Sequence, residues 1–407
     1  MTYETASPTV DTPRRAPTRV TLVLTAVGII LVAANLRPAV VAVAPLVDSI
    51  RLSTHWSSAM IGALTTLPLL MFGLAAPLGP YLAAKIGIER TIFAALITMI
   101  VGIALRALPN VGALFVGSAL IGVGVGICNA MLPALIKRDF ARRSGLMTGL
   151  YSMTLSGGAA VASAIVVPIH HAVGGQWRIA LAIWAIPTLV ALIVWIPQLR
   201  AVHRMHPTAH KGNSLLRNPI AWAITIFMGT QSTVFFASAA WLPEILIERG
   251  MTAAAAGAVL AVCQIAGLIS SLIAPMIAVR FEDQRVFTCI TIGICAAGFI
   301  GFLSTHQWPV LWTVCIMVGP GSCLALALLF MVLRSTSTEQ TGQVSGMAQS
   351  GGYVLAAAGP VALGLLHDLT GSWTIALGAL GLVLIPQTLA GLVAARNVTM
   401  STPDHTN

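Results

Sequence analysis

The sequence is poor in charge, and this scarcity excludes most classes of soluble protein. Only 8% of the 407 residues are Asp, Glu, Lys or Arg, whereas soluble domains usually carry about a quarter. Acids are the rarer sign, with 12 in the whole chain. Hydrophobic residues make up 57% and gather in long runs between about Thr21 and Ala394. Such runs predict helices that span a lipid bilayer and leave little chain for a soluble domain.

The sequence also lacks the patterns of a metal site or a hydrolase. Its six cysteines lie inside apolar runs, without CxxC spacing or a neighbouring His, so we expect small core residues, no metal and no cofactor. No nucleophile elbow or HExxH motif occurs, so we do not expect an enzyme. Gly122, Gly124 and Gly126 lie in an apolar run with no strand before them, which predicts close helix packing and not a dinucleotide site.

The formal net charge of +10 does not predict nucleic-acid binding, because the basic residues fall in short breaks and not on one amphipathic face. Their distribution instead predicts topology. One set of alternate breaks is rich in Lys and Arg, and the other set carries only Arg51, Arg106, Arg178 and Arg249. By the positive-inside rule, both termini are expected in the cytoplasm of a bacterial cell, with the chain crossing the inner membrane many times.

Polar and Pro/Gly breaks divide the apolar sequence into twelve expected helices. Each is expected to be helical because the backbone in lipid must satisfy its own hydrogen bonds. The expected helices cover residues 20–47, 56–84, 91–108, 111–136, 144–169, 178–197, 219–246, 252–279, 286–304, 308–333, 342–366 and 373–395.

The chain is expected to form two six-helix bundles, which are related by an internal repeat. SGLMTGLYSM in the first half matches TGQVSGMAQS about 197 positions later, and Ala76-Pro77 matches Ala274-Pro275 at a similar offset. Such duplication is typical of transporters whose halves rock about a midplane site. The expected units are a disordered cytoplasmic tail, an N-terminal bundle, a cytoplasmic linker, a C-terminal bundle and a second tail, at residues 1–19, 20–197, 198–218, 219–395 and 396–407.

Arg37 is expected near the middle of the membrane, about seventeen residues into the first helix. A cation there costs at least about 3 kcal/mol unless it faces a cavity or a partner. Two interpretations stay open: Arg37 pairs with a buried carboxylate and holds helices together, or it contacts a solute. No Asp, Glu or His is expected at a helix centre, which favours the second. A guanidinium fork suits carboxylate, nitro, cyanate or phosphate groups, and Pro38 is expected to bend the helix beside it.

Other polar residues expected at mid-membrane are candidates for the same cavity, although each is equally suited to an interhelical hydrogen bond. The candidates for contact with a solute, besides Arg37, are Asn35, Asn129, Tyr151, Gln231, Gln264, Gln349 and Tyr353. Asp48 and Glu244 lie at the outer ends of their helices. If transport is coupled to protons, these two acids are the candidates, and otherwise they are solvated helix ends.

Twelve spans, a six-plus-six repeat and a basic central loop resemble the major facilitator superfamily over essentially the whole chain. The superfamily's signature between helices 2 and 3 is glycine-rich, with an acid and several bases. The corresponding stretch reads GPYLAAKIGIERT, in which Lys85, Gly87 and Arg90 fit but Ala84 replaces the acid. The resemblance implies gating roles for Lys85 and Arg90, and the replaced acid weakens the charge lock.

Within that superfamily, NLRPAVVAVAPLV, PYLAAKIGIERT and SGMAQSGGYVLAAAGP resemble the bacterial cyanate and 2-nitroimidazole transporter family. The resemblance implies a monomer in the lipid bilayer that carries a small polar or anionic solute by alternating access. The alternative is an exporter of uncharged or cationic toxic compounds with the same fold. In both cases the expected partner is a small molecule and not a nucleic acid.

Overall fold

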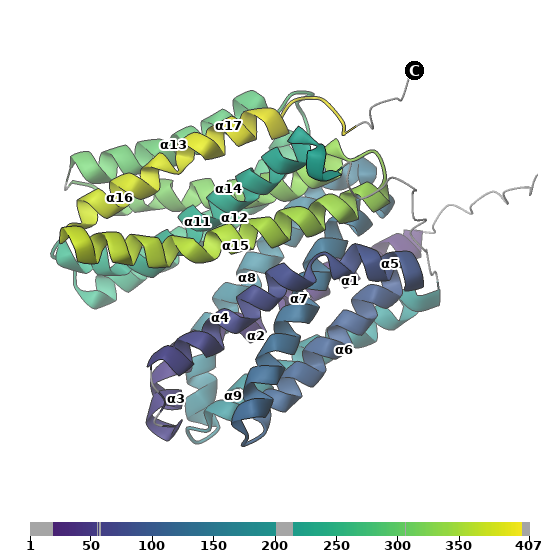
Figure 1. Ribbon diagram of the computed structural model, residues 1–407, viewed down its shortest axis with the longest axis horizontal. Coiled ribbons are helices and arrows are strands. Elements are labelled where there is room, and N and C mark those ends of the chain that lie inside the picture. The colour runs from purple at the N-terminus through teal and green to yellow at the C-terminus, as the bar shows by residue number, and fades with distance from the viewer. Residues whose placement is uncertain (1–18, 55, 57, 201–214, 306, 401–407) are drawn as a thin grey trace, which may run out of the picture.

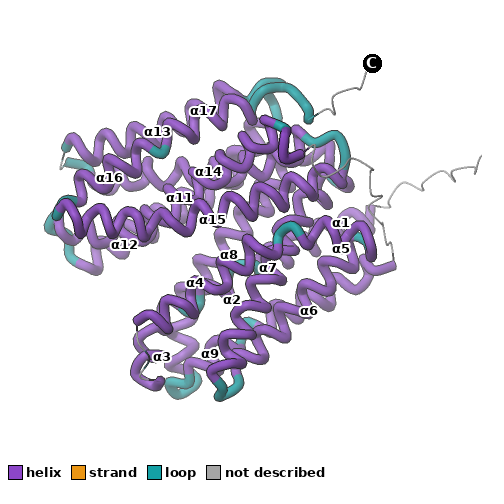
Figure 2. The backbone as a smooth tube through the Cα atoms, viewed as in Figure 1, coloured by secondary structure: helices purple, strands orange, loops and turns teal. Residues whose placement is uncertain are grey.

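The computed structural model describes residues 19–54, 56, 58–200, 215–305 and 307–400. Every regular element among them is a helix, and short connections join the helices (Figure 2). Apolar runs of this length leave the backbone no other way to satisfy its hydrogen bonds in lipid. Many large apolar side chains on the outer surface are exposed, including Val286 at 73% and Leu369 at 75%, as expected for helices that face lipid.

The first helices of the chain form one bundle, drawn in purple to teal in Figure 1. Three of its spans are interrupted: α1 (Arg19–Asn35) is followed by α2 (Pro38–Val41) and α3 (Val47–Thr54), α4 (Ser58–Ala75) by α5 (Leu78–Ile86), and α9 (Trp177–Ala182) by α10 (Ala185–Trp195). The other three are α6 (Ile88–Ala107), α7 (Val111–Asp139) and α8 (Ser144–Ala172).

The remaining helices form the second bundle, drawn in teal to yellow. They are α11 (Pro219–Glu248), α12 (Ala253–Ala278), α13 (Arg285–Ser304), α14 (Pro309–Arg334), α15 (Thr338–Thr370), α16 (Trp373–Leu382) and α17 (Leu384–Ala394). Short 3₁₀ turns connect some elements: η1 (Ala44–Leu46), η2 (Ala141–Arg143), η3 (Ile196–Arg200) and η4 (Leu215–Arg217).

The expected spans are recovered in the described residues. Eleven helical segments are long and apolar enough to cross a membrane, and α4 with α5 makes a twelfth if the bent pair is one span. The bend between α4 and α5 is 52° and falls at Ala76-Pro77. Proline explains the bend, because it has no N–H to continue the helical hydrogen bonds.

Glycines let α7 approach its neighbours closely, as predicted for the run Gly122–Gly126. A Cβ built on Gly122 would lie 2.3 Å from the carbonyl oxygen of Pro68, and one on Gly126 would lie 2.4 Å from that of Phe72. Both contacts are with α4, so any larger side chain would force the two helices apart. The backbones can therefore touch, which is how helices gain packing energy without a hydrophobic drive in lipid.

The two bundles meet at one end of the molecule and diverge at the other (Figure 1). We call the end with Arg19 and Ala394 the base, and the opposite end, with Thr54 and Thr370, the mouth. Near the base, a Cβ on Gly149 of α8 would lie 2.5 Å from the carbonyl oxygen of Leu272 in α12. The Ser152 hydroxyl donates to the Ser271 carbonyl across the same seam at 3.0 Å.

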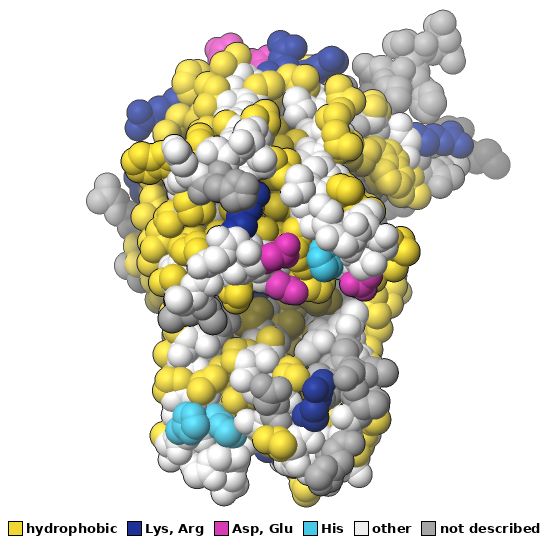
Figure 3. All heavy atoms as spheres, turned by 90° about the vertical axis from the view of Figure 1, so that its left-hand side faces the viewer, with side chains coloured by type: hydrophobic (Ala, Val, Ile, Leu, Met, Phe, Trp, Pro, Cys, Tyr) yellow, Lys and Arg dark blue, Asp and Glu magenta, His cyan; other side chains and the backbone are white. Residues whose placement is uncertain are grey.

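A second seam joins α15 to α4 and α7 near the base. There the Ser345 hydroxyl donates to the Asn129 carbonyl at 3.3 Å. Figure 3 looks onto the mouth, where a recess lined by hydrophobic side chains separates the two lobes. The structure is therefore closed at the base and open at the mouth.

The structure describes residues next to two of the expected segment boundaries. The expected linker begins at Gln198, but this residue lies in η3 and its Oε1 accepts a hydrogen bond from Thr25 at 3.1 Å. The expected tail after Ala395 also packs on the second bundle, since Met400 is 1% exposed and its N–H donates to the Arg334 carbonyl. Residues 1–18 of the tail predicted as disordered, and residues 201–214 of the linker, lie outside the described residues.

Candidate functional site

A break in the first span positions Arg37. Helix α1 ends at Asn35 and α2 begins at Pro38, so the bend predicted at this proline is an interruption. Arg37 precedes α2 with φ −105° and ψ −33°, and its carbonyl accepts from the N–H groups of Val40 and Val41 at 3.0 Å. The side chain of Arg37 thus projects from a short non-helical joint within the span, and helical backbone holds it on both sides.

The break frees backbone carbonyls, and neighbouring helices cover them. Pro38 has no N–H for the Ala34 carbonyl, and Gly158 of α8 packs so closely there that a Cβ would lie 2.5 Å from that oxygen. The Ala39 carbonyl accepts from Nη1 of Arg106 at 2.6 Å. Arg106 was expected in an outer loop, but it lies in the last turn of α6 and is 2% exposed. The apolar sequence around Arg106 gave no sign of this buried contact.

Arg37 lines a small cavity between the bundles. Helices α8, α11, α12 and α14 supply the rest of the lining, which consists of Arg37, Ser156, Gln231, Ser232, Phe235, Phe236, Gln264, Gly267, Leu268, Met317, Pro320, Gly321 and Leu324. The cavity volume is about 30 Å³, close to the share of one molecule in liquid water. The site as closed here therefore holds water or a very small solute, and a larger one requires the bundles to move.

Aromatic rings surround the guanidinium of Arg37. Its Nη2 lies 3.5 Å from the hydroxyl oxygen of Tyr353 in α15, and its Cζ lies 5.9 Å from the ring centroid of Phe235 in α11. The ring of Tyr353 packs on Phe72 at 4.1 Å and on Phe236 at 6.3 Å between centroids. Flat apolar walls with one cation at the end suit a planar solute that carries a negative or electron-rich group.

Arg37 forms no ion pair among the side chains that the structure describes. The ion-paired acids there are Glu89, Asp139, Asp283 and Asp368, and each lies with another base. The alternative in which Arg37 is neutralised by a buried carboxylate therefore has no support in this part of the chain. A cation held in a narrow cavity without a counter-charge attracts an anion from outside.

The structure brings the three candidate amides of the second bundle to different positions. Gln231 and Gln264 line the cavity with Arg37, and Nε2 of Gln231 donates to the Ser232 hydroxyl at 2.7 Å. Gln349 lies one helical turn from Tyr353 on the same face of α15 and is 1% exposed. Its Oε1 is buried and accepts no hydrogen bond from the described residues.

The candidates of the first bundle make hydrogen bonds between helices. The Asn35 amide donates to the Pro187 carbonyl at 3.2 Å, and its Oδ1 accepts from Thr188 at 3.1 Å. The Tyr151 hydroxyl donates to Oδ1 of Asn129 at 2.5 Å, and both side chains are buried. None of Asn35, Asn129 and Tyr151 lines the cavity.

The gating candidates Lys85 and Arg90 and the proton-linked candidate Glu244 do not line the cavity. Glu244 is exposed near the end of α11, and Lys85 and Arg90 are exposed at the base. The ammonium of Lys85 lies 4.3 Å above the ring of Tyr81. The side chain of Asp48 lies outside the described residues, so its prediction stays untested.

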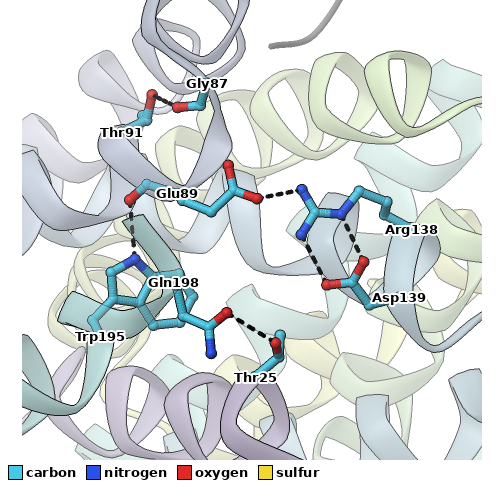
Figure 4. A network of polar contacts seen from close by, with 8 residues as sticks. All are labelled: Thr25, Gly87, Glu89, Thr91, Arg138, Asp139, Trp195 and Gln198. Atoms are coloured by element: carbon cyan, nitrogen blue, oxygen red, sulfur yellow. Dashed lines mark hydrogen bonds and ion pairs between the residues drawn. The ribbon is translucent and has the colours of Figure 1, made fainter. Parts of the chain in front are cut away.

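A buried ionic network at the base was missed by sequence reasoning (Figure 4). Glu89 of α6 is 2% exposed and accepts from Nη1 of Arg138 at 2.6 Å. Arg138 also makes two hydrogen bonds to Asp139, at 2.7 and 2.8 Å. The indole N–H of Trp195 donates to the Glu89 carbonyl at 2.9 Å. Glu89 follows Gly87 by two positions in the glycine-rich stretch, and this acid was the available signal.

Among the residues that the structure describes, no group of three or more His, Cys, Asp or Glu side chains is placed to hold a metal ion. All six cysteines are free, and Cys128, Cys263, Cys295 and Cys323 are buried. The site consists of one guanidinium, amides, hydroxyls and aromatic rings. Such groups bind and orient a molecule but offer no activated nucleophile or general base.

Comparison with known proteins agrees with this geometry. The model of the Major Facilitator Superfamily matches residues 22–360. An uncharacterized transporter of Bacillus subtilis, YycB, is 40% identical over 91% of the chain and 93% of its own length. The 2-nitroimidazole transporter of Escherichia coli is 38% identical over 91% of the chain and 95% of its own length. The cyanate transport protein CynX of Escherichia coli is 31% identical, covering 88% and 94%.

Solved structures agree on the fold. The proton:xylose symporter XylE superposes with a TM-score of 0.74 over 93% of the chain and 97% of its own, at 13% sequence identity. At this identity the similarity shows a common arrangement of helices and gives no information about the solute.

Proposed function

The chain belongs to the major facilitator superfamily and is a membrane transporter, and on this premise we propose that it carries a small, planar, polar or anionic solute that Arg37 recognises. Cyanate-like ions and nitro-heterocycles fit this description. Relatives named for 2-nitroimidazole and cyanate, at 38% and 31% identity, support the solute class. The observation that carries the proposal is Arg37 itself, without an ion-pair partner in the described residues, at a cavity shared by both bundles.

The chemistry of the cavity favours this solute over a cation. A guanidinium offers parallel N–H donors to two oxygens of a carboxylate or nitro group. The rings of Phe235 and Phe236 would cover the faces of a heterocycle, and Gln231 and Gln264 would orient its polar edge. Because no acid lines the cavity in the described residues, a cationic drug would meet repulsion and no attraction. The alternative function therefore lacks a matching counter-charge for cationic toxic compounds.

The proposed mechanism is alternating access, with bundles of residues 20–197 and 219–395 rocking about the cavity. From the Lys and Arg bias we infer that the base, with both termini, faces the cytoplasmic side of a bacterial inner membrane. In that orientation the structure is closed toward the cytoplasm and open outward. A solute would enter at the mouth, and opening the seams of α8 with α12 and of α15 with α4 and α7 would release it inside.

Transport by purified protein in liposomes tests the proposal. Labelled cyanate and 2-nitroimidazole would be offered separately to the wild type, to Arg37→Ala and to Arg217→Ala. Arg217 is an exposed arginine at the base and serves as the control for loss of one positive charge. We expect at least one probe to be transported by the wild type and the control and not by Arg37→Ala. Equal transport by a folded Arg37→Ala protein would refute the role of Arg37.

Transport only of cationic compounds, or of uncharged compounds that lack a nitro or other electron-rich group, would instead support the exporter. Resistance of expressing cells to such compounds would be the matching observation in vivo. Because both functions use one fold, the charge of the accepted solutes separates them better than the direction of transport.

A further inference from the structure

A second cavity lies at the base, on the seam between α8 and the second bundle. Its volume is about 550 Å³, far larger than the cavity at Arg37. One wall comes from η2 and the start of α8, and the other from the ends of α12 and α14 and the loop between α12 and α13. The lining residues that carry the argument are Arg142, Arg143, Ser144, Glu282, Gln284 and Arg334.

The cavity is basic, and its deepest charge is buried. Arg142 and Arg143 are exposed at the rim, whereas Arg334 is only 3% exposed. Nε of Arg334 donates to the Ala394 carbonyl at 2.9 Å, and its Nη2 donates to Gln284 and the Ala395 carbonyl. Nη1 of Arg334 donates no hydrogen bond to any described residue, and this nitrogen is not completely buried. This nitrogen of the cavity-lining side chain is therefore available to a ligand.

The start of α8 adds partial positive charge to the same cavity. Arg143 precedes this 29-residue helix and caps none of its N–H groups with its side chain, and the first turn contains no acid. Free N–H groups and the helix dipole together make a site that favours an anion. The helix start and the buried guanidinium are independent features that face one space.

The internal repeat supplies a comparison within the same molecule. The helix that corresponds to α8 in the second half is α15. The start of α15 has a side-chain cap and a negative charge that offset its helix dipole. There Ser337 accepts from the N–H of Gln340 at 3.1 Å, and Glu339 lies in the first turn. The chain thus supplies a negative charge at one of the two related helix starts and arginines at the other. The start of α8 is therefore the one of the two that an anion from outside the chain could compensate.

The acids nearby do not neutralise the cavity. Glu282 lines it but is exposed. Asp283 pairs with Arg285 at 2.8 Å, and the hydrogen bond from Arg285 lowers the pKa of its carboxyl below the usual value. Asp283 is also close enough to Arg334 to interact with its charge, but it does not line the cavity. Among the lining residues, three arginines face one exposed carboxylate, so the lining is net positive.

We propose that this cavity binds a phosphate-bearing anion and that the bound anion stabilises the closed base. Both bundles contribute donors, so a ligand held by Arg142, Arg143 and Arg334 together favours the conformation in which the seam is closed. In the orientation proposed above, the ligand comes from the cytoplasmic side. Its source is either the headgroup of an anionic lipid or a free phosphate, because both offer the same oxygens to the arginines.

Ligand-dependent thermal stability of the full-length purified protein tests the proposal, because an anion that binds only the folded state raises the melting temperature. The probes are inorganic phosphate, with sodium chloride at matched ionic strength, and nanodiscs that contain phosphatidylglycerol or only phosphatidylcholine. The variants are Arg142→Gln with Arg143→Gln, which change exposed side chains, and the control is Arg217→Gln at the base. The readout needs no transport, so its result is independent of the function proposed for Arg37.

We expect phosphate or phosphatidylglycerol to stabilise the wild type and the control, with affinity about tenfold weaker in the double variant, as for loss of charge-assisted hydrogen bonds. Stabilisation by inorganic phosphate would identify the phosphate group as sufficient, and stabilisation by phosphatidylglycerol alone would identify a lipid. Slower hydrogen exchange in the first turn of α8 with the probe would support the closed seam. No stabilisation by either probe, or an equal response of double variant and control, would overturn the proposal.

Discussion

Nη2 of Arg37 in the first bundle lies 3.5 Å from the hydroxyl oxygen of Tyr353 in the second. This distance is at the long end for a hydrogen bond, and the contact joins the two bundles. Tyr353 is 6% exposed, and Phe72 and Phe236 pack on its ring. The pair therefore connects the solute site to the relative position of the bundles.

Tyr353→Phe should weaken solute binding while the ring packing is retained. The phenol orients the guanidinium of Arg37 and can donate to a bound anion, and one such hydrogen bond is worth about 1 kcal/mol, or roughly fivefold in affinity. The measurement is the Michaelis constant for transport in liposomes, beside the melting temperature. An unchanged Michaelis constant at an unchanged melting temperature would show that the Tyr353 hydroxyl does not take part in solute binding.

Gly149→Val should prevent closure of the base. Its Cβ would lie 2.5 Å from the Leu272 carbonyl, so α8 and α12 would have to separate. We expect spin-label distances across the base to lengthen and transport to stop, while the protein stays folded. The measurement is double electron–electron resonance with labels at exposed sites of the two bundles.

Gly257→Val is the control for Gly149→Val. Gly257 also lies in a helix, but a Cβ there would meet nothing within 4 Å. Both variants make the same Gly-to-Val change inside a helix, so its effect on intrinsic helix propensity is the same and only the position relative to the seam differs. Similar distances and transport in the two variants would show that the seam at Gly149 does not gate the base.

Tyr151→Phe should reduce stability more than affinity. Its hydroxyl is the donor to Oδ1 of Asn129 at 2.5 Å, and the phenylalanine would leave that buried oxygen without it, at a cost of about 1–3 kcal/mol. Because neither residue lines the cavity, we expect a lower melting temperature in detergent and a Michaelis constant within about twofold of wild type. A large rise in the Michaelis constant with unchanged stability would indicate instead that Tyr151 and Asn129 contact the solute.

Arg138→Gln should destabilise the first bundle more than Asp139→Asn. Loss of Arg138 removes the guanidinium contact of Glu89, which is 2% exposed, and removing one partner of a buried ion pair is destabilising. Loss of the Asp139 charge leaves the contact with Glu89 in place. Melting temperatures of the two variants give the order, and equal values would contradict it.

The spans could be predicted from the sequence because a long apolar segment in lipid must satisfy its backbone hydrogen bonds by forming a helix. The predicted helices of both bundles are present in the structure. The break beside Arg37 was also predictable, because Pro38 lacks the N–H that would continue the helix. The sequence did not predict that Arg106 reaches the Ala39 carbonyl or that Asn35 bonds to Pro187. These contacts join helices far apart in sequence, and residue type and hydropathy carry no information about which faces meet.

The aromatic lining was missed for a related reason. Phe235 and Phe236 read as ordinary apolar residues of a span, and only the packing of α11 against the other helices turns them toward Arg37. The basic cavity at Arg334 was likewise hidden, because its arginines are separated by nearly half the chain. Polar residues inside apolar runs could be recognised as candidates from the sequence. Which of them line the cavity depends on hydrogen-bond partners in other helices, and the sequence does not reveal these.

The central claim is that the guanidinium of Arg37 recognises a negative group, and the preference for an anion over a neutral molecule of the same shape tests it most directly. Binding of imidazole-2-carboxylate and imidazole-2-carboxamide would be measured by titration calorimetry for the wild type, Arg37→Lys and Arg37→Gln. We predict that the wild type prefers the carboxylate, that lysine retains part of this preference, and that glutamine lowers it about tenfold or more. An undiminished preference for the carboxylate in a folded Arg37→Gln protein would contradict the account.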